Sequence, residues 1–174
     1  MNRAETTELL CALLERDVLS GTHWAREVKY LKLDGSIGRV DYMGFKPRTQ
    51  VHGPSASAVE GGQFTCYELK SCMADYKSGH GLNFIGEKNV MVIPMALYKQ
   101  LPQDELAKVS VYVPIPHYDV VATGDMKWAE WNEPHELTAD KREWRLAKMA
   151  DQMVVGNRRH SAAELLYAML KAGR

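Results

Sequence analysis

Two acidic residues and one lysine are the strongest candidates for chemistry in this sequence. Glu68 and Lys70 form a Glu-x-Lys triplet at the end of a predicted strand over residues 64–69. Side chains alternate between the two faces of a strand, so we expect Glu68 and Lys70 on one face and Leu69 on the other. Asp41 belongs to the preceding predicted strand, and pairing of the two strands would bring its carboxylate close to that of Glu68.

This grouping of residue types is suited to binding a divalent cation. Two carboxylates at close range repel each other unless a cation lies between them. Mg²⁺ and Mn²⁺ prefer oxygen ligands, often one or two carboxylates completed by water. We therefore expect Asp41, Glu68 and the backbone carbonyl of Leu69 to bind Mg²⁺ or Mn²⁺. Such an ion activates water and neutralises a phosphate, and Lys70 would position the water and stabilise the developing anion.

The sequence also predicts the elements that must position these residues. Apolar runs with strand-like patterns lie at 24–33, 37–45, 64–69, 89–94 and 109–115. Helical spacing predicts a first helix capped by Thr6 or Thr7, a helix from residue 71, a short helix at 95–101, and C-terminal helices at 138–155 and 161–171.

The resulting order, α-β-β-β-α-β-α-β-α-α, predicts an α/β fold with a mixed sheet and helices on its faces. We expect residues 1–137 to form one domain and residues 138–174 to form a helical extension packed on it. A Gly- and Pro-rich segment at 46–62 is predicted to be a long loop, and such loops often carry function.

Net charge does not identify a nucleic-acid-binding protein by itself, because the 174 residues contain 22 basic and 22 acidic side chains. The charge is nevertheless uneven. Residues 101–140 hold two lysines against eight acidic residues, and residues 141–174 hold eight basic against three acidic residues. Either these are two solvated faces that balance each other, or the basic segment guides a nucleic acid.

Cellular location can be predicted from what the sequence lacks. No apolar run approaches the roughly 20 residues of a membrane span, and the first residues, with Arg3 and Glu5, lack the apolar core of a secretory signal. The cysteines, Cys11, Cys66 and Cys72, are odd in number and lack zinc-site spacing. These observations predict reduced thiols in a cytoplasmic protein that does not bind a membrane.

With these elements in place, the sequence resembles the PD-(D/E)xK nuclease superfamily. Its core, α-β-β-β-α-β, has an acidic residue on the second strand and (D/E)-x-K on the third, which here match Asp41 and Glu68-Leu69-Lys70. The stretch from Glu68 to Tyr76 is similar to uncharacterised phage and prophage members and to a bacterial DNA-repair-type branch. The resemblance covers roughly residues 24–115. It implies a restriction-endonuclease-like core and Mg²⁺-dependent hydrolysis of DNA in a bacterial cytoplasm.

The resemblance also directs attention to other acidic residues. Many such nucleases use an additional upstream glutamate, for which Glu27 is the candidate, with Glu5 or Glu8 as alternatives. A salt-bridged strand face would explain Glu27 equally well. Asp75 follows the motif, and the resemblance implies a structural or supporting role for it. The sequence departs from the superfamily pattern in having Val40 instead of proline before Asp41, and in the long interval between Asp41 and Glu68.

Two other classes of function fit the sequence. One is a catalytically silent nuclease fold that acts as a DNA-binding or protein-interaction module. The other is a homodimeric scaffold that uses the apolar faces of the C-terminal helices, which fit packing on the sheet equally well. In the nuclease hypothesis, the 46–62 loop and the basic 141–160 segment guide the DNA, and the Arg158-Arg159-His160 cluster is either a backbone contact or a helix cap.

Overall fold

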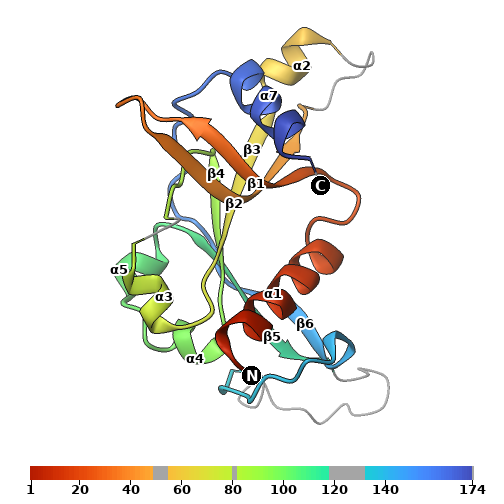
Figure 1. The fold of residues 1–174 in the computed structure, drawn as a ribbon, viewed down its shortest axis with the longest axis vertical. Coiled ribbons are helices and arrows are strands. Elements are labelled where there is room, and N and C mark those ends of the chain that lie inside the picture. Colours follow the sequence, from red (N-terminus) through yellow and green to blue (C-terminus); the bar gives the residue numbers. More distant parts are fainter. Residues whose placement is uncertain (49–54, 80–81, 118–131, 174) are drawn as a thin grey trace.

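A computed structural model describes residues 1–48, 55–79, 82–117 and 132–173 of the chain. These residues form a six-stranded sheet in which the strands are neighbours in sequence order, β1 to β6 (Figure 1). The strands are β1 (His23–Leu31), β2 (Ile37–Lys46), β3 (Gln63–Leu69), β4 (Lys88–Val92), β5 (Ser110–Pro116) and β6 (Trp144–Ala150).

The sheet is mixed, as the sequence predicts. β1, β2 and β3 pair antiparallel, β3, β4 and β5 pair parallel, and β6 returns antiparallel to β5. Parallel neighbours need a crossover connection. Short helices lie in these crossovers: α3 (Met73–Lys77) between β3 and β4, and α4 (Met95–Tyr98) and α5 (Gln103–Leu106) between β4 and β5. The α/β class with a mixed sheet and flanking helices is therefore confirmed.

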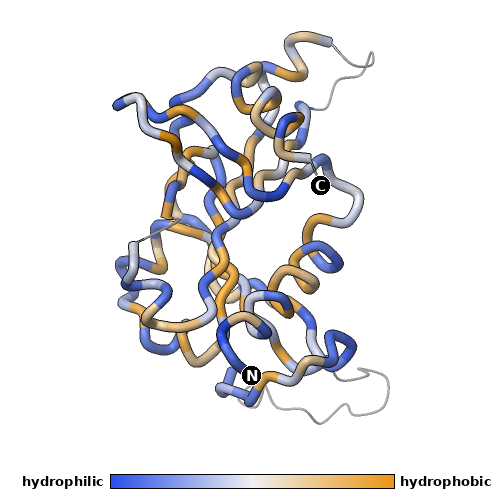
Figure 2. Tube along the Cα trace, viewed as in Figure 1, coloured by the Kyte–Doolittle hydropathy of each residue, from blue (hydrophilic) through white to orange (hydrophobic). Residues whose placement is uncertain are grey.

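Two longer helices, α1 (Arg3–Asp17) and α7 (Ala162–Ala172), cover opposite faces of the sheet. Cys66 of β3 packs in the apolar cluster that contains Leu165 of α7, whereas the next residue, Tyr67, packs in the cluster that contains Leu10 of α1. Consecutive strand residues point to opposite faces, which places the two helices on opposite sides. Hydrophobic residues accordingly run along the central strands and along α1 (Figure 2).

The ends of these helices are set by capping boxes. The side chain of Ser161 accepts a hydrogen bond from the N–H of Glu164 at the start of α7, as the sequence predicts. The predicted cap of α1 is wrong. The side chain of Asn2 accepts from the N–H of Glu5, and the hydroxyls of Thr6 and Thr7 instead donate to carbonyls one turn earlier within the helix.

The predicted helix at 138–155 is also wrong. Lys141–Glu143 form a short 3-10 turn, and Trp144–Ala150 form β6. In Trp144-Arg145-Leu146 the apolar residues alternate with a polar one, which is the period of a strand, and Trp144 and Leu146 both pack towards α1. Pairing with β5 supplies the long-range hydrogen bonds that decide between the two patterns. Residues 138–174 thus contribute a strand to the main sheet as well as α7, and no basic helix spans 141–160.

The remaining predictions concern the 46–62 segment and membrane spans. A short helix, α2 (Ala56–Glu60), lies within the predicted loop, and the side chain of Ser55 caps it. Residues 49–54 of that loop lie outside the described part of the chain. Every helix in the described ranges is too short or too polar to span a bilayer.

Candidate functional site

The pairing of β2 with β3 brings Asp41 and Glu68 together, as the sequence predicts. The register aligns Tyr42 with Tyr67, so the next pair along this antiparallel ladder is Asp41 and Glu68. The N–H of Leu69 donates a 2.9 Å hydrogen bond to Oδ2 of Asp41. This bond fixes one oxygen of Asp41 against the end of β3. The other oxygen, Oδ1, faces the guanidinium of Arg39.

Glu68 is in an unusual environment for a carboxylate. Its side chain is 0% exposed, and neither carboxylate oxygen has a hydrogen-bond partner among the described residues. Burial, followed by the negative charge of Asp41, raises the pKa of Glu68 to about 10. A buried carboxylate without partners is costly. Without a cation, Glu68 therefore stays protonated at neutral pH.

Lys70 completes the group. Its side chain is only 4% exposed, and its positive charge opposes the rise in the pKa of Glu68. Its N–H donates to the carbonyl of Val92 in β4, which fixes the backbone just beyond β3. The sheet thus holds two carboxylates and one ammonium group at the same end of two neighbouring strands.

A polar cavity of about 640 Å³ opens beside this group. Asp41, Leu69 and Lys70 line it together with residues of α1, of the β1–β2 hairpin and of the segment after β3. Four further basic side chains contribute to the lining: Arg3, Arg26, Lys32 and Arg39. We call this cavity the cleft. With Lys70 these make five basic side chains against three carboxylates in the lining, those of Glu27, Asp41 and Asp75, and the excess of positive charge suits a polyanion. Sequence reasoning missed these residues because only the fold brings them together.

Glu27, the predicted upstream glutamate, lies on the edge of the cleft but has a different partner. Its Oε2 forms an ion pair of 2.8 Å with Nη1 of Arg39. Nη2 of the same guanidinium lies 3.9 Å from Oδ1 of Asp41. Within the described residues, no three His, Cys, Asp or Glu side chains are placed to hold a metal ion together. Because one guanidinium contacts both Glu27 and Asp41, Arg39 separates Glu27 from the two carboxylates. The alternatives Glu5 and Glu8 do not line the cleft.

The backbone at Glu27 explains how the hairpin presents so many polar groups. Its φ is 51°, and it is the one non-glycine residue with positive φ in the described ranges. On either side of it, Ala25 and Val28 both pack in the cluster under α7, although residues three apart in a regular strand face opposite sides. Val40 and Met43 in β2 show the same departure.

The register of the β1–β2 ladder is nevertheless unbroken on both sides of this irregularity. Consecutive residues of each strand therefore line the cleft: Arg26 and Glu27 from β1, and Asp41 and Tyr42 from β2. The guanidinium of Arg26 lies over the Tyr42 ring, with its carbon 5.2 Å from the ring centre. A strict alternating pattern in the sequence gives no signal for this arrangement.

Asp75 has the structural position that the resemblance implies. It is 8% exposed and accepts hydrogen bonds from Nη2 of Arg3 at 2.6 Å and from the N–H of Ser71 at 3.2 Å. It therefore connects the start of α1 to the chain that follows Lys70. Lys77, at the end of α3, is exposed and does not line the cleft.

Other predicted contact residues lie away from the cleft. The guanidinium of Arg158 forms an ion pair of 3.3 Å with Glu87 and lies over the ring of Phe64, so this residue packs against the β3 region. His160 stacks edge-on against Tyr30. Burial raises the pKa of the Cys66 thiol to about 12, which agrees with a packing role. His80, the candidate phosphate contact, lies outside the described residues.

Comparisons with known proteins give a fold but no family. No protein-family model matches the chain, and no curated protein matches it. Among solved structures, the chain is similar to the SPO1766 protein of unknown function from Silicibacter pomeroyi, with a TM-score of 0.52 and 13% sequence identity. The match covers 95% of this chain and 84% of that one. At this identity, the similarity shows a shared fold alone.

Proposed function

We propose that this protein is a metal-dependent nuclease that hydrolyses DNA phosphodiester bonds in the cytoplasm, with Asp41 and Glu68 as metal ligands and Lys70 as the residue that positions the attacking water. One observation supports the proposal above the others. Glu68 is fully buried beside a second carboxylate, and both of its oxygens lack hydrogen-bond partners among the described residues. A structural carboxylate in such a position would normally be paired.

The residues present fit a hard divalent cation such as Mg²⁺ or Mn²⁺. Asp41 offers Oδ1, Glu68 offers two buried oxygens, and the carbonyl of Leu69 is the third proposed ligand. An ion held by one or two carboxylates and completed by water is typical of Mg²⁺. Its charge would remove the repulsion between the acids and would allow Glu68 to ionise.

The chain's own groups then have separate tasks. When bound, a divalent cation supplies positive charge for the phosphate oxygens and lowers the pKa of a coordinated water. Lys70 donates a hydrogen bond to the attacking water and orients it toward phosphorus. As the attacking water forms the new bond to phosphorus and gives up a proton to solvent, the bond to the leaving oxygen breaks, and this oxygen takes a proton from solvent. Arg3, Arg26 and Lys32 hold the neighbouring phosphates.

A cleavage assay with matched variants tests the proposal. The purified protein is incubated with plasmid and single-stranded DNA in Mg²⁺ or Mn²⁺, and products are resolved on gels. We expect Glu68→Gln and Lys70→Met, which preserve size, to reduce the rate by about 100-fold or more. Lys99→Ala removes an exposed lysine outside the cleft and should cleave like the parent. Circular dichroism verifies that each variant is folded.

Two results would contradict the nuclease: no cleavage by the parent with either metal, or equal cleavage by Lys70→Met. One observation favours a second candidate, a catalytically silent nucleic-acid-binding module. The described residues offer no third acidic side chain to the proposed ion, because Arg39 holds Glu27. Calorimetric titration with Mn²⁺ separates the candidates, since a silent module without a metal site gives no binding heat.

A further inference from the structure

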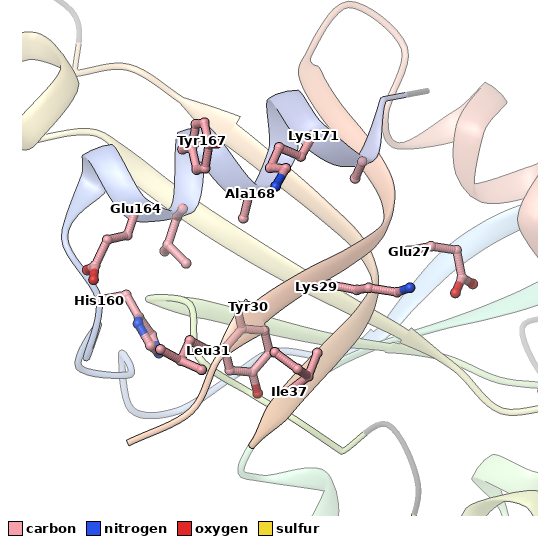
Figure 3. A pocket seen from close by; sticks show the side chains of 12 residues that line it. Glu27, Lys29, Tyr30, Leu31, Ile37, His160, Glu164, Tyr167, Ala168 and Lys171 are labelled. Atoms are coloured by element: carbon pink, nitrogen blue, oxygen red, sulfur yellow. The ribbon is translucent and has the colours of Figure 1, made fainter. Parts of the chain in front are cut away.

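A second cavity lies between the β1–β2 hairpin and α7 (Figure 3). Its volume is about 710 Å³, within the roughly 300–1,000 Å³ typical of small-ligand sites. Aliphatic side chains including Leu31 and Ile37 line it, together with three aromatic rings, those of Tyr30, Tyr167 and His160. Leu31, Ile37 and Tyr167 are each more than 60% exposed, so a ligand there would cover apolar surface. We call this cavity the hairpin pocket.

The charged groups around the hairpin pocket favour an anion. Glu164 already accepts hydrogen bonds from Ser161, and Glu27 is paired with Arg39. Lys171 lies over the ring of Tyr167, with Nζ 5.4 Å from the ring centre. Lys29 forms no ion pair with any residue in the described part of the chain. Glu164 keeps its negative charge, so the two lysines and Arg39 face two carboxylates, which leaves a small excess of positive charge beside an aromatic and aliphatic surface.

The hairpin pocket adjoins the cleft. Glu27 and Ile37 line both cavities, and the side chain of Lys29 extends from β1 towards Glu27 (Figure 3). The ring of Tyr30 packs across the hairpin onto β2. This ring lies on Gly38, where a Cβ atom would come within 2.3 Å of the ring. Gly38 lines the cleft and Tyr30 lines the pocket. Because β1 is an edge strand and Glu27 and Ile37 border both cavities, a strand whose backbone lies in the cleft would pass these residues to enter the pocket.

We propose that the hairpin pocket binds one unpaired base of the nucleic-acid strand held in the cleft, so that the substrate is single-stranded where it meets the protein. A nucleotide combines the two features that the pocket requires, an aromatic ring and an adjacent anion. The base would stack on Tyr167, and Lys29 and Lys171 would contact the neighbouring phosphate. Paired bases inside a duplex cannot enter a side pocket without unstacking. This inference rests on the proposed function.

Binding measurements test the pocket without relying on hydrolysis. They use the Glu68→Gln protein in Mg²⁺, in which we expect cleavage to be slowed by about 100-fold or more, and fluorescence anisotropy of a short labelled oligonucleotide. A series of oligonucleotides each lacks one base at a different position. We expect single strands to bind about tenfold more tightly than the duplex, and one missing base to reduce affinity by about tenfold.

Pocket variants identify where that base binds. Tyr167→Ala removes an exposed ring, and Ala168→Trp fills the pocket. In both variants, removal of the sensitive base from the oligonucleotide should no longer reduce its affinity, and this loss of affinity is the penalty for the missing base. Leu170→Ala removes an exposed side chain of the same helix that does not line the pocket, and should behave like the parent. The inference is overturned by equal binding of duplex and single strands, by an oligonucleotide series with no sensitive position, by pocket variants that keep the penalty, or by a lack of binding.

The outcomes for the pocket and for the nuclease are distinguishable. If the protein that retains Glu68 cleaves DNA but the oligonucleotide series shows no sensitive position, the nuclease is supported and the pocket assignment is wrong. If that protein cleaves nothing but one base is needed for binding, the pocket assignment is supported and the protein is a single-strand-binding module without nuclease activity.

Discussion

A Glu-x-Lys triplet occurs in β1 and again at the end of β3, and the two copies lie in opposite environments. At the end of β3, between β2 and β4, Glu68-Leu69-Lys70 is buried, with Asp41 across the register. In β1, an edge strand of the described sheet, Glu27-Val28-Lys29 places its two charges on the surface, and Arg39 neutralises the glutamate. The comparison shows that a Glu-x-Lys triplet becomes a candidate site only where the fold removes water and supplies a second acid.

The largest contrast between the two glutamates should appear in the pH dependence of stability. The pKa of Glu68 is raised from 4.5 to about 10 in the folded protein. In metal-free protein, the contribution of this group to the free energy of unfolding should therefore be largest below pH 4.5. Between pH 4.5 and about 10, the free energy of unfolding should fall by up to about 1.4 kcal/mol per pH unit as the pH rises. Glu68→Gln should lack this slope.

Urea unfolding across that pH window measures the effect. Glu136→Gln, which changes an exposed glutamate elsewhere, should keep the parent slope. Parallel curves for the parent and Glu68→Gln would show that Glu68 ionises normally, which would remove the main support for the metal site. Added Mn²⁺ should flatten the parent curve, because a bound cation favours the ionised carboxylate.

A smaller effect should separate Glu27 from the metal ligands. The guanidinium of Arg39, 3.9 Å from Asp41, repels a cation at this site, and Glu27 holds the guanidinium aside. Arg39→Gln should therefore increase Mn²⁺ affinity by about fivefold, and Glu27→Gln should decrease it by a similar factor. Isothermal titration measures both. A complete loss of Mn²⁺ binding in Glu27→Gln would instead make Glu27 a ligand, as the sequence interpretation proposed.

The smallest effect concerns the backbone of β1. Glycine tolerates a φ of 51° better than other residues do. Glu27→Gly should therefore be about 1 kcal/mol more stable than Glu27→Ala in chemical unfolding, although both variants lose the ion pair with Arg39. At the neighbouring exposed position Lys29 the order should reverse, because glycine weakens a regular strand. The same order at both positions would contradict the left-handed conformation of Glu27.

Much of this molecule was predictable because the evidence is local. The apolar runs of β1 to β5 and the Ser161 cap of α7 depend on neighbouring residues, and the structure confirms them. The proximity of Asp41 and Glu68 was also predictable, since two antiparallel strands joined through one connection have few registers that bury their apolar faces.

The errors and omissions come from contacts between distant segments. Trp144 to Ala150 has apolar residues compatible with a helix, and pairing with β5 makes it a strand. The basic lining of the cleft depends on residues from α1 and from both strands of the hairpin, whose positions only the fold relates. The conformation of Glu27 follows from the packing of both strands of the hairpin, and no residue type in the sequence announces it.

The contact between Tyr30 and Gly38 limits how the two cavities can be studied. The ring of Tyr30, which lines the pocket, rests on Gly38, which lines the cleft. Any side chain introduced at residue 38 would push this ring aside and alter the shape of both compartments together. A mutant at Gly38 would therefore report a mixture of effects, and assigning a phenotype to either compartment requires changes on α7 or at the end of β3, away from this contact.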